Sequence, residues 1–205
     1  MSDYENILAE KDRTISVDEA RRRMPTLQRI QNQELRQEVR ELTCYAPEYF
    51  WYRPGSYEGY HNGERYGLWH HTLKLSTAID ICGESMLEAG TIVQEDLDNA
   101  HAAAIVHDQW KNGANPDSGR THTNHAEVAA VVAEQHGLNP YICDAILTHM
   151  GPWDENPEPS GTVETLVHTA DLMASDDDVS LAIYGPCPNE LMDIVDSTRR
   201  LPDDG

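Results

Sequence analysis

An apolar helical stretch that ends in a histidine and an aspartate constrains this chain more than any other segment. Residues 102 to 111 read AAAIVHDQWK, so small and apolar residues run directly into His107 and Asp108, with Lys111 soon after. A helix of this composition is buried on nearly all sides. Burying an imidazole and a carboxylate costs several kcal/mol unless something compensates them. A divalent cation would do so. A capped helix end with a salt-bridged Asp108 explains this segment, taken alone, about equally well.

The composition indicates one acidic domain. The chain has 205 residues, enough for one domain with a full core and an appended arm. Its formal net charge is −21, and the lysines number only three: Lys11, Lys74 and Lys111. Acidic residues spread along the whole chain resemble the surfaces of proteins from salt-loving archaea. At low salt such a charge opposes non-specific binding to nucleic acid, so we expect a small-molecule substrate.

The cysteines and the hydropathy indicate the compartment. The four cysteines are far apart and form no CxxC motif, as is typical of buried thiols in a reducing environment. We find no signal peptide and no apolar run that approaches about 18 residues. We therefore expect a cytoplasmic protein without a membrane span. If the chain forms a homodimer, we expect the N-terminal helix or the aromatic loop of residues 45–67 to provide the interface.

Helical periodicity dominates the chain, and we expect an all-α fold, a compact bundle of about six to eight helices. We expect residues 1–59 to form an N-terminal helical arm and an aromatic loop packed on the domain. Residues 60–175 would form the domain itself, and residues 176–205 a short C-terminal extension. Residues 45–67, rich in aromatics, Gly and Pro, are predicted to be an ordered loop that could act as a substrate wall or lid.

Ligand-type side chains recur on the apolar faces of the expected helices. These helices cover residues 68–89, 95–109, 125–136, 141–149 and 162–175. The side chains are His71, His107, Asp108, His125, His149 and Asp171. One buried histidine is usually a satisfied core residue, but four histidines and two aspartates would each need a partner of their own. Their chemistry suits Mn²⁺, Fe, Mg²⁺, Ni²⁺ or Zn²⁺. Two such ions that share Asp108 would use six ligands better than one ion.

The order H…HD…H…H…D resembles the HD-domain superfamily of metal-dependent phosphohydrolases, in particular members with a dinuclear ligand set. The resemblance spans roughly residues 60 to 175 and implies a helical bundle of the HD-domain type. His71 within GLWHHT matches the first family histidine, and His107 and Asp108 match the pair that names the family. His125 within NHAEVAA and His149 within ILTHMGPW match the two further histidines of dinuclear members. Asp171 within VHTADLMAS matches the closing aspartate.

The resemblance also assigns roles around the metal ligands. HDQWK is similar to the family's HD-x-x-K form, which implies that Lys111 contacts the substrate phosphate. His168, three residues before Asp171, is expected to orient a ligand from behind or to assist protonation. His61, in the aromatic loop, is either a hydrogen-bonded loop residue or a substrate contact. Members that cleave cyclic dinucleotides often carry a second adjacent histidine and a GYP element. Here Met150 and GPWDENP follow His149, so we do not assign that activity.

The resemblance implies hydrolysis of a phosphomonoester or phosphodiester, a nucleotide above all, with Asp108 and Lys111 as catalytic residues. Two cations would lower the pKa of a bridging water enough to give a hydroxide that attacks phosphorus in line. One alternative is a mononuclear HD-type 5′-nucleotidase in which His125 and His149 bind phosphate instead of metal. The others are a regulatory module that binds metal and nucleotide without turnover, and a helical domain that uses a metal as a structural staple.

Overall fold

The computed structural model describes residues 8, 12–56, 62–113, 124–153, 155–176, 178–183 and 188–198. Over these ranges the chain contains eight α-helices, three short 3₁₀ helices and no strand, which confirms the expected all-α fold. The elements are α1 (Val17–Arg23), η1 (Pro25–Arg29), α2 (Gln33–Thr43), η2 (Glu48–Trp51), α3 (Gly67–Glu88), α4 (Gln94–Val106), α5 (His125–His136), α6 (Pro140–Thr148), η3 (Gly151–Trp153), α7 (Thr162–Ser175) and α8 (Pro188–Thr198).

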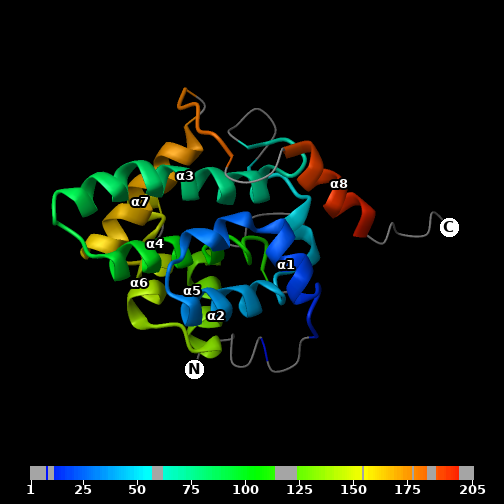
Figure 1. Cartoon of the computed structure of the whole chain (residues 1–205), viewed down its shortest axis with the longest axis horizontal. Coiled ribbons are helices and arrows are strands. Elements are labelled where there is room, and N and C mark those ends of the chain that lie inside the picture. Colours follow the sequence, from blue (N-terminus) through cyan, green and yellow to red (C-terminus); the bar gives the residue numbers. More distant parts are fainter. Residues whose placement is uncertain are drawn as a thin grey trace.

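Helices α3 and α4 form the centre of the bundle (Figure 1). Every residue of α4 from Leu97 to Val106 is buried, as the small and apolar composition of this segment predicts. Helix α3 packs against α4 on one side and against α7 on another. Gly83 allows the close approach of α3 and α4, because a Cβ there would lie 2.5 Å from Leu97 Cδ1. This pair carries the first ligand-type side chains of the sequence into the core.

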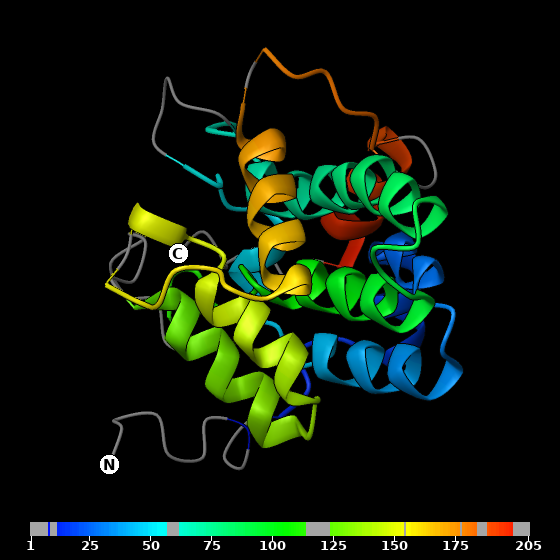
Figure 2. The same ribbon diagram turned by 90° about the vertical axis from the view of Figure 1, so that its left-hand side faces the viewer.

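Helices α5 and α6 lie side by side, and α6 also packs against α4 and α7 (Figure 2). Helix α6 begins at Pro140, which suits the first turn of a helix, and the Asn139 side chain accepts a hydrogen bond from the Ile142 backbone N–H at 3.2 Å. The ends of α4 and α6 and the start of α5 therefore meet beside α3 and α7.

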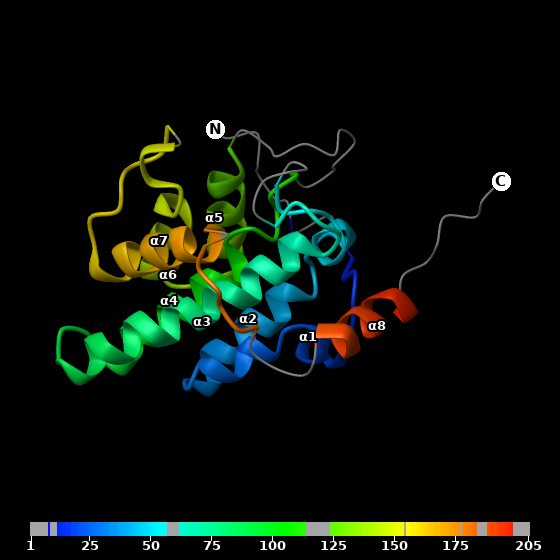
Figure 3. The same ribbon diagram turned by 90° about the horizontal axis from the view of Figure 1, so that it is seen from above.

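The N-terminal helices cover the far side of α4, and a buried carboxylate fixes them there. Asp98 on α4 accepts hydrogen bonds from the backbone N–H groups of Gln31 at 3.0 Å and Asn32 at 2.7 Å. These two residues lie directly before α2, so the start of α2 is tied to α4. Helix α8 packs against α1, at the opposite end of the molecule from α6 and α7 (Figures 1 and 3).

The aromatic segment contains a helix that its sequence did not indicate. Where we expected a loop over residues 45–67, Glu48–Trp51 form the 3₁₀ helix η2, with Tyr49, Phe50 and Trp51 buried. Tertiary burial stabilises this turn in spite of the surrounding Gly and Pro residues. Residues 57–61 lie outside the described ranges. In the part of the chain that the structure describes, no helix is both long and apolar enough to cross a membrane.

Candidate metal centre

Helix ends and buried helix faces bring the six expected ligand side chains together. His107 directly follows α4, His149 directly follows α6, and His125 is the first residue of α5. His71 lies near the start of α3 and Asp171 in the last part of α7. All six side chains belong to buried residues. Polar groups at this depth require partners, so their mutual arrangement determines what the site can do.

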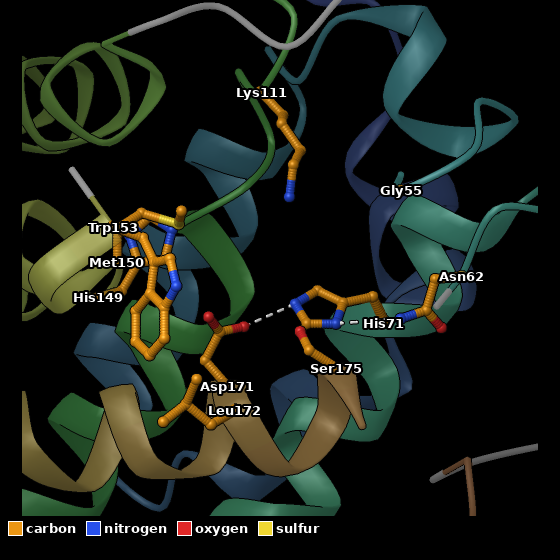
Figure 4. Close-up of a pocket in the computed structure, with 10 residues that line it drawn as sticks. All are labelled: Gly55, Asn62, His71, Lys111, His149, Met150, Trp153, Asp171, Leu172 and Ser175. Carbon is orange, nitrogen blue, oxygen red and sulfur yellow. Dashed lines mark hydrogen bonds and ion pairs between the residues drawn. The ribbon is translucent and has the colours of Figure 1, made fainter. Parts of the chain in front are cut away.

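We call His71, His107 and Asp171 the first half-site. His71 Nε2 lies 2.8 Å from Asp171 Oδ1, an interaction drawn in Figure 4, and 3.3 Å from His107 Nε2. His107 Nε2 lies 3.8 Å from Asp171 Oδ1. Three ligand atoms from three different helices or helix ends thus surround one point.

His125 and His149 form the second half-site. Their Nε2 atoms lie 3.3 Å apart. His125 Nε2 is 3.4 Å and His149 Nε2 is 3.9 Å from Asp108 Oδ1. The second half-site therefore consists of two imidazoles that face a single carboxylate oxygen.

The Asp108 carboxylate stands between the two half-sites. Its Oδ2 lies 3.4 Å from His107 Nε2 and accepts a 2.6 Å hydrogen bond from Lys111 Nζ. Its Oδ1 faces the second half-site and has no hydrogen-bond partner among the described residues, although it is fully buried. A buried carboxylate oxygen without a partner is unfavourable, and a cation is the partner that the surrounding nitrogen atoms would also bind.

Backbone carbonyls fix the orientation of two of the imidazoles. His107 Nδ1–H donates to the Ala104 carbonyl at 2.8 Å, and His149 Nδ1–H donates to the Ile146 carbonyl at 2.7 Å. Because the proton is held on Nδ1, the Nε2 lone pair of each ring is directed at the centre. This is the arrangement in which a histidine serves as a metal ligand.

Burial and charge shift the pKa values of five of these side chains, and every shift except that of His107 favours the form that binds a metal. Burial lowers the pKa of His125 to about 3 and that of His149 to about 4, so both imidazoles are neutral at pH 7. Burial would raise the pKa of Asp108, but Lys111 and the neighbouring histidines outweigh it and hold the pKa well below its usual range. Asp171 keeps a lowered pKa through His71 in the same way. Burial opposes protonation of His107, but the two carboxylates and the Ala104 carbonyl raise its pKa.

The spacing of the donor atoms fits divalent cations. Two atoms that each lie about 2.1 Å from one cation are about 3.0 to 3.4 Å apart in octahedral or tetrahedral coordination. The contacts within and between the half-sites range from 2.8 to 3.9 Å. His71, His107 and Asp108 form one candidate metal group, and Asp108, His125 and His149 form another. Imidazole and carboxylate ligands suit Mn²⁺, Fe, Ni²⁺ and Zn²⁺, so the residues present fit one or two such ions.

A pocket of about 240 Å³ opens onto this centre (Figure 4). His71, His149, Asp171 and Lys111 contribute to its lining, and the Lys111 side chain points into it. Trp153 and Met150 lie on the same side as His149, whereas Asn62 and Gly55 lie beyond His71. A small ligand in this pocket would therefore contact the candidate metal ligands from one side and protein walls from two others.

Asn62 and Trp153 are among the lining residues to which the sequence assigned no site role. Asn62 Nδ2 lies 3.5 Å from His71 Nδ1, and Lys74 Nζ donates to Asn62 Oδ1 at 2.9 Å. Asn62 lies in the segment rich in Gly and Pro, where no periodicity indicates which side chain points inward. The only signal in the sequence was its partner Lys74, one of just three lysines. Trp153 is the other of these two residues. An aromatic residue four positions after a candidate ligand could have indicated it.

His168 contacts the centre through the backbone. Its Nδ1–H donates to the His149 carbonyl at 2.6 Å. The same ring lies under Gly151, where a Cβ would come within 2.5 Å of His168 Cε1, and the φ angle of Gly151 is +56°. Of the two expected roles, this contact supports orientation of a ligand rather than protonation. The other histidine considered, His61, lies outside the described residues.

Comparison with known proteins gives one match. A family model described as HD domain matches residues 68–176, a range that contains all six candidate ligands and Lys111. No curated protein and no solved structure matches the chain.

Proposed function

The chain belongs to the HD domain family, whose members are generally metal-dependent hydrolases, and on this premise we propose that it is a metal-dependent phosphohydrolase. Its substrate would be a phosphomonoester or phosphodiester, a nucleotide above all, and its centre would be dinuclear. The family relation supports the hydrolase class, and the geometry of the site supports the finer proposal.

One observation carries the dinuclear proposal: the two oxygens of Asp108 face different half-sites. Oδ2 lies beside His107 and Oδ1 beside His125 and His149. A carboxylate in this position can bridge two cations, one in each half-site. In the mononuclear alternative, His125 and His149 would bind phosphate. At pH 7 their low pKa values leave both imidazoles neutral, so they would offer a phosphate no positive charge.

The side chains of this protein then have separable tasks. Nδ1 of His107 and of His149 holds a proton against a carbonyl, which keeps Nε2 available to a cation. Asp171 and Asp108 supply the negative charge that offsets that of the cations. Lys111 places an ammonium group in the pocket, where it would donate a hydrogen bond to a phosphoryl oxygen of the substrate. Bound divalent ions would supply polarisation of the phosphoryl group and a lowered pKa of water.

The test combines metal analysis with hydrolysis. We expect purified protein to contain close to two metal ions per chain and to hydrolyse p-nitrophenyl phosphate or its bis-ester when Mn²⁺ is added. Asp108→Asn keeps the side-chain volume but loses the bridging charge, so turnover should fall by at least about a thousandfold. Asp144→Asn, an exposed aspartate on α6, is the matched control and should retain both metal and turnover.

Two outcomes would contradict the proposal in different ways. One metal per chain, with cleavage of the monoester alone, would indicate the mononuclear nucleotidase. Absence of transition metal together with absence of turnover would leave a binding module without catalysis.

A further inference from the structure

The rim of the pocket carries an exposed tryptophan. Trp153 is 66% exposed, whereas Trp51, Trp69 and Trp110 are each 0% exposed and belong to the core. Leu172 on α7 also lines the pocket and is 43% exposed. A single exposed apolar residue needs no explanation, but two that border the same pocket form an apolar wall next to the candidate metal ligands.

The position of Trp153 is fixed relative to the metal centre. The indole ring lies against the His168 ring, with the ring centroids 6.2 Å apart and the planes at 35°. His168 in turn donates to the His149 carbonyl at 2.6 Å. The Trp153 backbone N–H donates to the Met150 carbonyl at 3.4 Å, which closes the short helix η3. Trp153 is therefore held by the residues that also hold the candidate ligand His149.

The size and charge of the surroundings limit what this wall can bind. The pocket measures about 240 Å³, below the range of about 300 to 1,000 Å³ that encloses a whole drug-sized ligand, so part of such a ligand would lie outside it against the exposed rim. A chain with net charge −21 repels a polyanion. An indole face binds planar aromatic rings by stacking, in the way that aromatic side chains bind nucleobases. A sugar phosphate offers no such ring.

We propose that Trp153 stacks on the base of a mononucleotide whose phosphate lies at the metal centre beside Lys111. Trp153 then determines specificity, and His168 is a positioning residue that holds the indole in place. The proposal rests on the proposed function, because the phosphate must be bound at the candidate metal centre for the base to reach this wall.

Tryptophan fluorescence tests the stacking directly, because the other three tryptophans are buried. The probes are the non-hydrolysable phosphonate analogues of adenosine monophosphate and of ribose 5-phosphate, each titrated into the Zn²⁺-loaded protein. We expect saturable quenching by the adenosine compound and none by the ribose compound. In Trp153→Phe the quenching should disappear, while calorimetry still detects binding of the adenosine compound.

Affinities measured by calorimetry provide the second readout. Trp153→Ala should weaken binding of the adenosine compound by about 5- to 150-fold, the range of one base stacked on an aromatic ring. Binding of the ribose compound should change by less than about twofold, since no base is present to stack. Tyr141→Ala removes an aromatic residue of similar exposure, 67%, from the other end of α6 and should change neither affinity.

The outcomes separate this inference from the proposed function. Equal binding of both compounds, with no quenching of Trp153, would overturn the stacking but would not contradict the proposed phosphohydrolase function. Binding of neither compound, together with no hydrolysis of phosphate esters, would overturn both. A blue shift of the Trp153 emission with rising protein concentration, without nucleotide, would show that a second copy of the chain covers the wall and would also overturn the stacking.

Discussion

The two half-sites that meet at Asp108 contain the same kind of side chain but compensate for its burial differently. In the first half-site, the Asp171 carboxylate lies 2.8 Å from His71 and Asp108 Oδ2 lies 3.4 Å from His107. In the second, His125 and His149 face each other and one carboxylate oxygen that has no hydrogen bond. In the first half-site carboxylate oxygens lie beside the imidazoles, whereas in the second the low pKa values keep both imidazoles neutral.

This difference predicts unequal metal binding. Two carboxylates border the first half-site, so a divalent cation there gains more from electrostatic attraction than one between the two imidazoles. The second half-site depends on the single oxygen that it has in common with the first. We therefore expect the first cation to bind more tightly than the second.

The largest expected effect comes from removing one ligand from each half-site. Asp171→Ala should remove the more tightly bound metal ion and lower turnover by more than about a hundredfold. Residues that only orient a metal ligand typically cost about 10- to 100-fold. His149→Ala should reduce the metal content from about two ions per chain to about one, because the first half-site stays intact. Elemental analysis and turnover with Mn²⁺ measure both effects.

His136→Ala, which removes a half-buried histidine at the last position of α5, is the control for both variants. If the ion that remains in Asp171→Ala bound as tightly as the ion that remains in His149→Ala, the inequality of the half-sites would be contradicted. An unchanged metal content in His149→Ala would favour the mononuclear centre.

A smaller effect is expected from pH in the metal-free protein. The pKa values of about 3 for His125 and about 4 for His149 lie below the ordinary value of 6.5. Between these values the unfolded chain binds protons that the folded chain does not, so the free energy of unfolding decreases as the pH falls. Each fully responding histidine contributes about 1.4 kcal/mol per pH unit, and we expect a loss of roughly 1 to 3 kcal/mol between pH 6 and pH 5.

Burial also lowers the pKa of His70, which acts in the same direction in this window, whereas His107, Asp108 and Asp171 act outside it. The raised pKa of His107 stabilises the fold below pH 6.5 and loses that effect as the pH rises through its folded value. The lowered pKa values of Asp108 and Asp171 matter only near and below their ordinary value of 3.8. Urea unfolding after chelation measures the change, and His149→Gln should make it shallower. Constant stability from pH 7 to pH 5 would contradict the assignment of neutral imidazoles.

The smallest expected effect concerns His168, which supports the second half-site from behind. His168→Ala removes the donor to the His149 carbonyl, and the weaker metal should bind up to about tenfold less tightly, the lower limit for partners that orient a ligand. Calorimetric titration with Zn²⁺ should show no change at the first half-site. His70→Ala, beside a ligand in sequence but packed against Tyr66 and Trp69, is the control. A loss as large as that of His149→Ala would contradict the supporting role.

Strongly periodic helices could be predicted closely from the sequence. The expected bounds of α5 (125–136) and α7 (162–175) agree with the structure to the residue. Helix α4 ends at Val106, three residues before the expected end at Gln109. Gln109 instead directs its side chain to Thr43 Oγ1 and the Ile105 carbonyl, at 3.1 and 2.9 Å. A turn stabilised by a distant side chain leaves no periodic signal in its own sequence.

For the centre, the sequence indicated residue types and helix faces but not atoms. The spacing of 71, 75 and 79 placed His71 inward, and the structure buries it. Which oxygen of Asp108 faces which histidine depends on how α4, α5 and α6 end against one another, and no local pattern encodes that. Lys111, which was expected to contact phosphate, forms an ion pair with Asp108, three positions earlier in the sequence. Asn62 reaches the pocket from an irregular segment and Trp153 from the single 3₁₀ turn η3, and in both places side-chain direction follows from tertiary packing.

The contact between Gly151 and His168 has an evolutionary consequence. A side chain at position 151 would collide with the imidazole at 168 and would also have to adopt a left-handed backbone. The two positions can therefore change only in order: a smaller residue at 168 first, and only then a side chain at 151. Among descendants of this sequence, a lineage that keeps the histidine is bound to keep the glycine, whereas one that has lost it is free to remodel the turn that carries Trp153.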